Sequence, residues 1–433
     1  MLKRPGAAGR RGTLGVVTLF DDLSWRGLVH QVTDDALPDL LSRERFTAYV
    51  GFDPTADSLH VGNLQQICTL RRLQLAGHRP IALVGGGTGM VGDPSGKSDE
   101  RVLLTPDVLA ANREGIRVQL ERFLDFSEGG AVLADNYEWL GSAGLLEFLR
   151  DVGKHFSVNE MVRKDSVRSR LQGREHGLSF TEFSYMLLQS WDFVVLHDRY
   201  GCRLQLGGSD QWGNITEGVD LLRRVRSAHG FGLTSPLVTK ADGSKFGKSE
   251  AATVWLDARR TSPYAFFQFW LNTADAEVGS YLRRFTFQDS DTIEVLEGVT
   301  ARQPERREAQ RVLARELTTL VHGADESARA EAAAAALFTP DIAALDASVL
   351  EAALADAPQS PAGLPVTLTE AFVAAGLVGS KSAARRALGE HALYVNNRRE
   401  TDDRSLSAAD ALHGRWIVLR HGRRNQHVMV VTP

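Results

Sequence analysis

Segments rich in strand-forming residues alternate with helical patterns between Phe46 and Leu237. A strand is expected over Phe46–Phe52, a helix from about Val61, and a second strand over Ile81–Val84. Strands that alternate with helices in this way build a mostly parallel sheet with helices on its faces. This part of the chain is therefore predicted to be an α/β domain.

The pattern becomes helical after about Glu250. Helices are expected over four segments, with few strand candidates between them: Ser262–Leu271, Ala276–Phe287, Glu305–Val321 and Ala328–Leu337. The last segment contains five consecutive alanines, and alanine has the highest helix propensity. An α-helical domain is therefore expected to follow the α/β domain.

Residues 355–366 contain three prolines and a glycine, which is typical of a linker. The unit after it, residues 367–433, is expected to be a small α+β domain with two short helices and three strands. From Ser380 to His427 it carries ten Lys and Arg against five Asp and Glu, in a chain of net charge −4. Positive charge gathered in one small domain favours a polyanionic partner.

Composition excludes several classes of protein. No run of about 18 apolar residues is present, so no transmembrane helix is expected. The two cysteines, Cys68 and Cys202, cannot build a disulfide framework, and they suggest buried thiols in a reducing compartment. Residues 1–18 are basic at their start and lack the apolar core of a secretory signal. We therefore expect a cytoplasmic protein with a disordered N-terminal extension.

Two glycine-rich segments match nucleotide-binding motifs, but neither fits the structure that the motif requires. Residues 87–92 fit the dinucleotide pattern, yet a proline and a glycine follow at once where a helix should begin. Residues 96–98 resemble the end of a P-loop, but the loop before them is one residue too short. The glycines from Gly85 onward still allow backbone to approach a ligand closely.

His60, Gly62 and Asn63 lie where the first strand turns into the helix from Val61. A helix N-terminus supplies unpaired N–H groups and the positive end of the helix dipole. The His and Asn side chains add donors, and glycine removes steric bulk. This turn is therefore a candidate phosphate site.

Lys245 and Lys248 stand three residues apart in a polar loop, with Gly247 between them. Such a loop suits a flexible arm that brings positive charge to a pyrophosphate leaving group.

A polar stripe is predicted on an otherwise apolar helix. Ser179 and Glu182 form a capping-box pattern at its start. Tyr185, Gln189 and Asp192 follow with i, i+4 and i+7 spacing, which places them on one face. Buried polar side chains need partners. A polar amino-acid ligand would supply them, and so would an internal hydrogen-bond network.

The motif around His60 and the motif around Lys245 together resemble the signatures of class I aminoacyl-tRNA synthetases. The first signature of that class is His-Ile-Gly-His, and here it reads His60-Val-Gly-Asn63. The second is Lys-Met-Ser-Lys-Ser, and here it reads Lys245-Phe-Gly-Lys248-Ser249. Five further segments, in order, look like bacterial tyrosyl-tRNA synthetases: residues 49–60, 91–97, 153–159, 181–189 and 207–214. The small basic domain looks like an αL-type RNA-binding fold.

The resemblance implies three domains: a Rossmann-like catalytic domain over 19–245, an α-helical anticodon-binding domain over 246–354, and an αL-type RNA-binding domain over 367–433. It implies a tyrosine–tRNA ligase, which activates tyrosine with ATP and passes it to the terminal ribose of tRNA(Tyr). ATP with Mg²⁺ would be a substrate, with no tightly bound cofactor. The resemblance also implies a homodimer.

Roles for individual residues follow from the same resemblance. Those expected to bind tyrosine are Tyr49, Asp53, Tyr185, Gln189, Asp192 and Gln211, with Tyr49 and Asp192 at the phenol and Tyr185 and Gln189 at the ammonium group. Those expected to bind ATP are Gly51, His60, Gly62, Asn63, Gly208, Asp210 and Lys248. Those expected to act in catalysis are His60, Thr55, Lys97, Arg101, Lys245, Lys248 and Ser249. Those expected to bind RNA are Lys381, Arg385, Arg386 and Arg398, and no metal ligand is expected.

Three alternatives stay open. A tryptophanyl enzyme would share the fold, but Tyr49 and the polar stripe favour a phenol. Another nucleotidyltransferase with the first signature would not need the basic C-terminal domain. An RNA-binding protein without activity would not need His60, Asp210 and Lys248.

Overall fold

The computed structural model describes residues 18–95, 104–164, 167–168, 178–239, 246–247, 253–336, 340–355, 357–422 and 425–431. Of the predicted N-terminal extension, residues 1–17 lie outside this description, and Thr18 caps the first helix. The chain divides into two compact units, residues 1–248 with 279–293, and residues 249–278 with 294–433. The finer domain boundaries expected from the sequence remain predictions.

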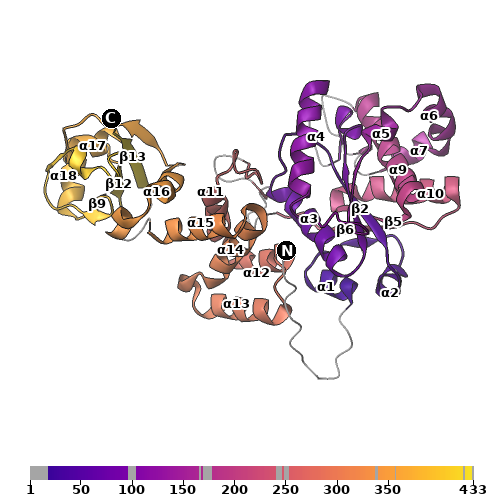
Figure 1. The fold of residues 1–433 in the computed structure, drawn as a ribbon, viewed down its shortest axis with the longest axis horizontal. Helices are drawn as coiled ribbons and strands as arrows, with labels where there is room; N and C mark the ends of the chain where they lie inside the picture. Colours follow the sequence, from indigo (N-terminus) through magenta and orange to yellow (C-terminus); the bar gives the residue numbers. More distant parts are fainter. Residues whose placement is uncertain are drawn as a thin grey trace. The chain divides into compact units, whose positions relative to one another are not determined.

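A six-stranded sheet forms the centre of the first unit (Figure 1), with the order β1-β6-β5-β2-β3-β4. Its strands are β1 (Gln31–Val32), β2 (Thr47–Phe52), β3 (Arg79–Val84), β4 (Val132–Asp135), β5 (Cys202–Gly208) and β6 (Phe231–Ser235). From β6 to β4 each neighbouring pair is parallel, whereas β1 pairs antiparallel with β6. The predicted mostly parallel sheet is confirmed.

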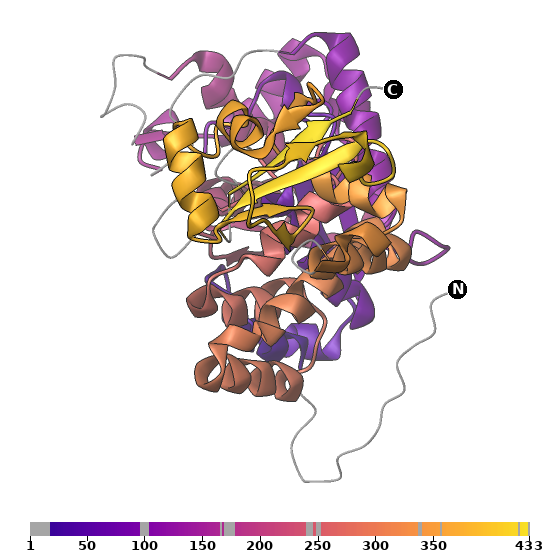
Figure 2. The same ribbon diagram turned by 90° about the vertical axis from the view of Figure 1, so that its left-hand side faces the viewer.

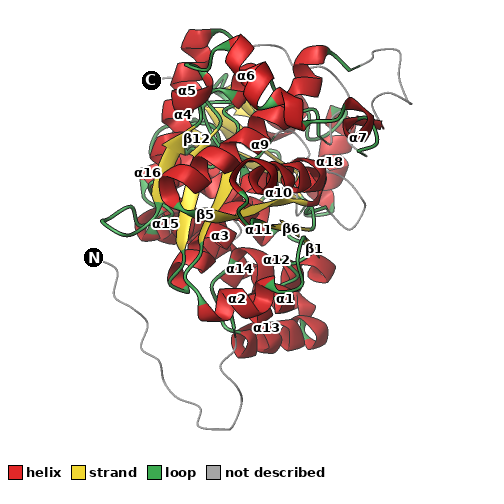
Figure 3. Cartoon of the chain, turned by 90° about the vertical axis from the view of Figure 1, so that its right-hand side faces the viewer, coloured by secondary structure: helices red, strands yellow, loops and turns green. Residues whose placement is uncertain are grey.

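Helices cover this sheet. They are α1 (Leu19–Trp25), α2 (Leu37–Arg43), α3 (Val61–Leu75), α4 (Pro106–Leu120), α5 (Tyr137–Leu140), α6 (Leu145–Asp151), α7 (Val158–Met161), α9 (Phe180–Tyr200) and α10 (Trp212–Arg226), with short 3-10 turns η1 (Thr88–Met90), η2 (Gly153–His155) and η3 (Ser209–Gln211). In Figure 3, α9 and α10 lie together over the strands. Phe193 of α9 and Leu221 of α10 share a buried cluster with Tyr49 of β2 and Ile81 of β3. Both cysteines are buried thiols, as expected.

The order of the strands places a switch point beside β2. From β2 the chain proceeds to β3 and β4 on one side, and then continues to β5 and β6 on the other side of β2. In open α/β sheets the crevice at such a point, at the carboxyl ends of the strands, binds the ligand. The fold therefore directs attention to the segments that follow β2 and β5.

Helices dominate the first part of the second unit. They are α11 (Pro263–Leu271), α12 (Asp275–Phe285), α13 (Ser290–Arg302), α14 (Glu308–His322), α15 (Ala324–Ala336) and α16 (Ala347–Leu354), with turns η4 (Pro304–Arg306) and η5 (Pro340–Ala344). The four predicted helices correspond to α11, α12, α14 and α15. Helix α13 was not predicted, because several β-branched residues and Gly298 lower its helix propensity. Burial of Ile293 and Leu296 on one face stabilises it instead.

Two helices cross the boundary between the units, α12 and α13, and α13 does so after Ile293. Residues Asp275–Val278 of α12 belong to the second unit, and Gly279–Phe285 belong to the first.

The C-terminal part is a small α+β fold, drawn in yellow and orange in Figure 2. Its helices are α17 (Leu368–Ala374) and α18 (Lys381–Gly389), and its strands are β7 (Gln359–Pro361), β8 (Val366–Thr367), β9 (Leu393–Val395), β10 (Arg398–Arg399), β11 (Ser405–Leu406), β12 (Trp416–His421) and β13 (Asn425–Val430), with the turn η6 (Ala408–Asp410). The two predicted helices are confirmed, and the three predicted strands correspond to β9, β12 and β13, whereas the short strands β7, β8, β10 and β11 were not predicted. Within the segment expected to be a linker, β7 pairs in parallel with β13.

Two apolar clusters stabilise this part. Phe372 of α17 and Leu388 of α18 pack on one of them with Ile417 and Leu419 of β12. The other joins Trp416 to residues of α15 and α16, including Leu350 and Leu354. The small fold therefore has a core of its own and a second core that it shares with the preceding helices.

Candidate active site

His60 is the N-cap of α3, the helix that follows β2. Its Nδ1 accepts a hydrogen bond from the backbone N–H of Gly62 (3.0 Å), and the Asn63 side-chain oxygen accepts from the backbone N–H of His60 (3.1 Å). A ring nitrogen that accepts carries no proton, so the neutral imidazole carries its proton on Nε2. A donor of this kind at a helix N-terminus suits a phosphate oxygen.

Gly62 is required by this geometry. A Cβ at that position would lie 2.7 Å from Cε1 of the His60 ring. Gly247 of the second signature lies against the same turn, since a Cβ on it would meet Cγ2 of Val61 at 3.1 Å and the backbone nitrogen of Gly62 at 3.5 Å. Its φ of +86° is also one that residues with a side chain rarely adopt. The structure thus brings together two motifs that are nearly 190 residues apart in the sequence.

Asp192 lies on α9 and is buried. Its Oδ1 accepts from Nε1 of Trp139 (2.8 Å), and its Oδ2 accepts from Nδ2 of Asn136 (2.9 Å). Burial raises the pKa of this carboxyl to about 8. Two N–H donors hold the carboxyl in place.

Tyr49 of β2 lies near enough to Asp192 for the charge of that carboxyl to act on its hydroxyl. The ring is fully buried, and its centroid lies 5.6 Å from that of Phe193. Burial, and next the charge of Asp192, raise the pKa of the Tyr49 hydroxyl well above its usual value. Among the described residues this hydroxyl has no hydrogen-bond partner. A buried hydroxyl without a partner beside a buried carboxyl is a place where a ligand hydroxyl would be satisfied.

Asp53 follows β2 and is held from two sides. Its Oδ2 accepts from the hydroxyl of Tyr185 (2.9 Å), and its Oδ1 accepts from the hydroxyl of Thr88 (2.8 Å). The side chain of Asn136 donates to the same Thr88 hydroxyl (3.0 Å). One hydrogen-bonded chain therefore runs from Tyr185 through Asp53, Thr88 and Asn136 to Asp192.

A second polar chain involves η3 and the start of α10. Nε2 of Gln211 donates to Oδ2 of Asp93 (2.6 Å). Nδ2 of Asn214 donates to Oε1 of Gln189 (3.0 Å). Asp53, Asp93 and Asp192 all act electrostatically on the Tyr185 hydroxyl, and burial together with these charges raises its pKa. Several acceptors around one buried site favour a cationic group such as an ammonium ion.

The residues expected at the nucleotide lie at the same edge of the sheet. Gly208 ends β5 and Asp210 lies in η3, and a Cβ on Gly208 would lie 2.5 Å from Oδ1 of Asp210. Gly51 is an exposed residue of β2, and Thr55 is an exposed residue of the loop that joins β2 to α3. Five residues of the predicted site lie outside the described residues: Lys97, Arg101, Lys245, Lys248 and Ser249.

The predicted RNA contacts lie in the C-terminal fold. Lys381, Arg385 and Arg386 are exposed on α18, and Arg398 is exposed on β10. Lys381 pairs with Glu370 at 2.7 Å, so its charge is partly compensated within the protein.

Sequence reasoning missed the residues that form hydrogen bonds with the predicted site residues. These are Thr88, Asp93, Asn136, Trp139 and Asn214. Two signals were present. Asn136 directly follows the carboxyl end of β4, with Trp139 in the short helix α5 after it, and Thr88 lies in the glycine-rich run after β3.

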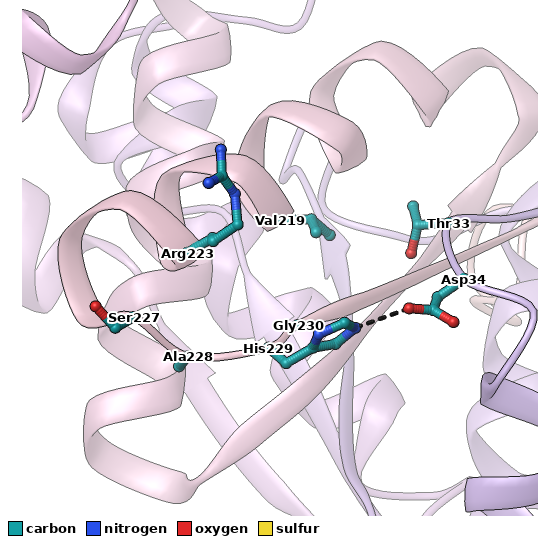
Figure 4. Close-up of a pocket in the computed structure, with 8 residues that line it drawn as sticks. All are labelled: Thr33, Asp34, Val219, Arg223, Ser227, Ala228, His229 and Gly230. Atoms are coloured by element: carbon teal, nitrogen blue, oxygen red, sulfur yellow. Dashed lines mark ion pairs between the residues drawn. The ribbon is translucent and has the colours of Figure 1, made fainter.

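A separate pocket of about 220 Å³ lies at the amino end of β6 (Figure 4). In it, His229 pairs with Asp34 at 3.0 Å. The pocket lies at the opposite end of the strands and contains none of the predicted site residues.

The described part of the chain holds no group of three or more His, Cys, Asp or Glu residues arranged to bind a metal ion. No helix within it is long and apolar enough to cross a membrane.

Comparisons with known proteins identify the family of this chain. Residues 41–339 match the family "tRNA synthetases class I (W and Y)", and residues 350–429 match the C-terminal domain of tyrosine–tRNA ligases. Tyrosine–tRNA ligase of Roseiflexus castenholzii is 54% identical over 423 residues, which are 96% of this chain and 99% of the relative. That of Geobacillus stearothermophilus is 52% identical over 417 residues, which are 95% and 99% of the two chains. A truncated mitochondrial tyrosyl-tRNA synthetase of Aspergillus nidulans is 32% identical with a TM-score of 0.67, over 74% of this chain and 94% of that one.

Proposed function

The chain belongs to the class I tRNA synthetases of the tryptophan and tyrosine family, and from that membership we propose which of its residues carry out tyrosine–tRNA ligation. In this reaction the tyrosine carboxylate attacks the α-phosphate of ATP, and pyrophosphate leaves. A ribose hydroxyl of tRNA then attacks the carbonyl of tyrosyl-adenylate. No protein nucleophile is needed, so catalysis consists of positioning and of stabilising charge.

The phenol of tyrosine binds between Tyr49 and Asp192. The single observation that carries this assignment is the buried Tyr49 hydroxyl without a partner, next to a carboxyl held by Trp139 and Asn136. A phenol hydroxyl can donate to the carboxyl and accept from Tyr49 at the same time. Phenylalanine would leave both groups buried and unsatisfied, which is costly.

The ammonium group of tyrosine binds near Tyr185, Gln189 and Asp93. Each of these side chains offers an oxygen acceptor, and nearby carboxylates stabilise the positive charge. Gln211 orients Asp93 through its hydrogen bond. Asp53 positions the Tyr185 hydroxyl in the same way.

The phosphates of ATP bind at the N-terminus of α3. His60 donates from Nε2, and Thr55, Asn63, Lys97, Arg101, Lys245, Lys248 and Ser249 act on the charge that develops as pyrophosphate leaves. Gly51, Gly62 and Gly208 leave room for the nucleotide, and Asp210 accepts from its ribose. Mg²⁺ enters with ATP as part of the substrate.

A homodimer forms through the α/β domain of a cytoplasmic enzyme. Leu145, Leu146 and Leu149 of α6 are 72%, 80% and 47% exposed. Apolar side chains exposed together mark an interface. Leu146→Glu should shift the sedimentation coefficient of the protein toward that of the monomer.

The basic C-terminal fold binds tRNA(Tyr). Arg385, Arg386 and Arg398, with Lys381, supply positive charge for the phosphate backbone, which dominates affinity for nucleic acids.

Amino-acid-dependent exchange between ATP and pyrophosphate, measured without tRNA, tests the proposal. Tyrosine, phenylalanine and tryptophan are offered separately, and exchange is expected with tyrosine alone. Tyr49→Phe should weaken tyrosine binding and reduce its advantage over phenylalanine. Exchange with tryptophan instead would move the assignment to the other member of the family. A folded protein that binds tRNA but exchanges with none of the three would contradict a catalytic role.

A further inference from the structure

The C-terminal end of α12 is clasped by buried cationic side chains. Nη1 of Arg72 donates to the carbonyl oxygen of Arg284 (3.0 Å), and its Nη2 donates to those of Arg283 (3.3 Å) and Thr286. Arg72 is 4% exposed, and burial lowers its pKa to about 10. Burying a guanidinium is expensive, so the contacts it makes here have to be strong.

Two further side chains complete this clasp. Arg26, which follows α1, donates to the carbonyl oxygens of Arg283 (3.0 Å) and Gln288 (2.9 Å). The Cys68 thiol donates to the carbonyl oxygen of Phe285 (3.3 Å). The last carbonyls of a helix lack partners within the helix, and its negative dipole end favours cations. The clasp therefore fixes the end of α12 against α3, which carries both Cys68 and Arg72.

The same helix holds the second signature. Phe246 stacks on Phe285, with ring centroids 5.5 Å apart and an interplanar angle of 15°. It meets Tyr281 edge to face at 5.2 Å. Tyr281 and Phe285 are one helical turn apart on α12, so they form one aromatic seat. Gly247, the next residue after Phe246, lies against Val61 and Gly62 at the start of α3.

These contacts connect the two signatures through α12. Helix α3 begins with His60, and further along it Cys68 and Arg72 hold α12. Phe246 packs on Tyr281 and Phe285 of α12, and Gly247 contacts the start of α3. Lys245 and Lys248 flank this seated pair in the sequence.

We propose that α12 is a positioning element for adenylate formation. Its aromatic seat, Tyr281 and Phe285, holds the second signature against the N-terminus of α3, and Arg72 and Arg26 keep α12 in register with α3. This inference rests on the proposed role of Lys245 and Lys248 at the phosphates. Tyr281, Phe285 and Arg72 touch no reacting atom in this proposal and act through the lysines.

Phe246→Ala removes the ring from the seat. The rate of adenylate formation, measured by rapid quench at saturating tyrosine and ATP, should fall about 10–100-fold, because misplacing a catalytic group by about 1 Å costs that much. The tyrosine dissociation constant, measured without ATP, should stay unchanged. Phe246→Tyr keeps the ring and should retain most of the rate.

Tryptic cleavage after Lys245 or Lys248 gives a readout that does not depend on activity. Loss of the ring in Phe246→Ala should speed this cleavage, and Phe246→Tyr should not. If the wild-type protein shows no tyrosine-dependent exchange but the cleavage rates still differ as expected, the proposed function fails and the seat stands. Equal cleavage rates and an equal rate of adenylate formation would overturn the seat.

Arg72→Lys tests the clasp, since one ammonium group cannot reach all three carbonyls as the guanidinium does. Slower adenylate formation and faster cleavage are expected, with tyrosine binding unchanged. Arg71→Lys is the matched control, because Arg71 lies over the Phe287 ring as Arg72 does but donates to the carbonyl oxygen of Phe123 and not to those at the end of α12. A loss of tyrosine binding in proportion to the loss of rate would show general damage to the fold, and that result would overturn a positioning role for the clasp.

Discussion

The pocket around Asp192 and the exposed face of α18 are both rich in polar residues, but they are built in opposite ways. In the pocket the described polar side chains are buried or half-buried, and they hold one another through two hydrogen-bonded chains. These chains draw on α9, α10 and the segments that follow β2, β3 and β4. On α18 the basic side chains are exposed, and Lys381 pairs with Glu370 at the surface.

This difference in burial determines how much binding energy depends on each side chain. Removing one partner inside the pocket leaves another group buried and unsatisfied, which costs its full desolvation energy. Removing one charge from α18 costs little, since water and salt screen exposed charges. Tyrosine recognition should therefore depend on single atoms, whereas recognition of RNA should depend on the sum of several charges.

Asp192→Ala should have the largest effect. It removes the acceptor of the phenol and leaves Trp139 and Asn136 without their partner. The kcat/KM for tyrosine in the exchange assay should fall about 100-fold or more. Asp198→Ala is the matched control, because Asp198 lies on the same helix, is exposed and pairs with Arg226. An unchanged kcat/KM in Asp192→Ala would break the contrast between the two regions.

The Asp192 carboxyl also makes stability depend on pH. Burial raises its pKa from 3.8 to about 8, so the folded protein holds the proton that the unfolded chain releases. The stability from this group is complete below pH 3.8 and is lost as pH rises toward 8. Between about pH 5 and 8, the free energy of unfolding of Asp192→Asn should therefore rise relative to wild type, by roughly 3–4 kcal/mol.

Urea unfolding at the two pH values measures this change. Asp198→Asn is the control, since hydrogen bonding to Arg226 lowers the pKa of Asp198. Its contribution is lost only as pH falls below the usual carboxyl range. A constant difference between Asp192→Asn and wild type across the window would contradict burial as the cause.

Tyr49→Phe should have a smaller effect and sharpen the contrast. It removes one neutral donor from the phenol, so tyrosine should bind about tenfold more weakly. The free protein should not lose stability, because the hydroxyl has no partner among the described residues. Equilibrium dialysis and thermal unfolding measure the two quantities. A variant that is destabilised while it binds tyrosine normally would show that the hydroxyl has a structural role instead.

Much of this pocket could be predicted from sequence. The i, i+4, i+7 spacing placed Tyr185, Gln189 and Asp192 on one face of a helix, and the structure confirms that helix as α9, with Ser179 accepting from the backbone N–H of Glu182. The strand and turn around His60 were also predicted correctly. These features follow from local periodicity and capping, which neighbouring residues in the chain determine.

The hydrogen-bond partners of Tyr185 and Asp192 could not be predicted from local periodicity. Asn136 and Asp192 are 56 residues apart, and Tyr185 and Asp53 are 132 apart. Periodicity identifies the face of a helix but not the strand end that it meets. The acceptor role of His60 Nδ1 was hidden for a related reason, since it depends on the rotamer that places the ring over Gly62.

The smallest effect for each side chain changed is expected on α18. Arg385→Glu with Arg386→Glu should raise the KM for tRNA in the charging assay about tenfold at low salt and reduce its salt dependence, because fewer phosphate contacts release fewer counterions. Tyrosine-dependent exchange should not change.

Lys381→Ala should raise the KM for tRNA less than Arg385→Ala does, since Glu370 already compensates the charge of Lys381. Truncation of the whole domain would be a poorer test, because Trp416 shares a core with Leu350 and Leu354. Equal effects of Lys381→Ala and Arg385→Ala would show that the pairing with Glu370 does not persist when RNA binds.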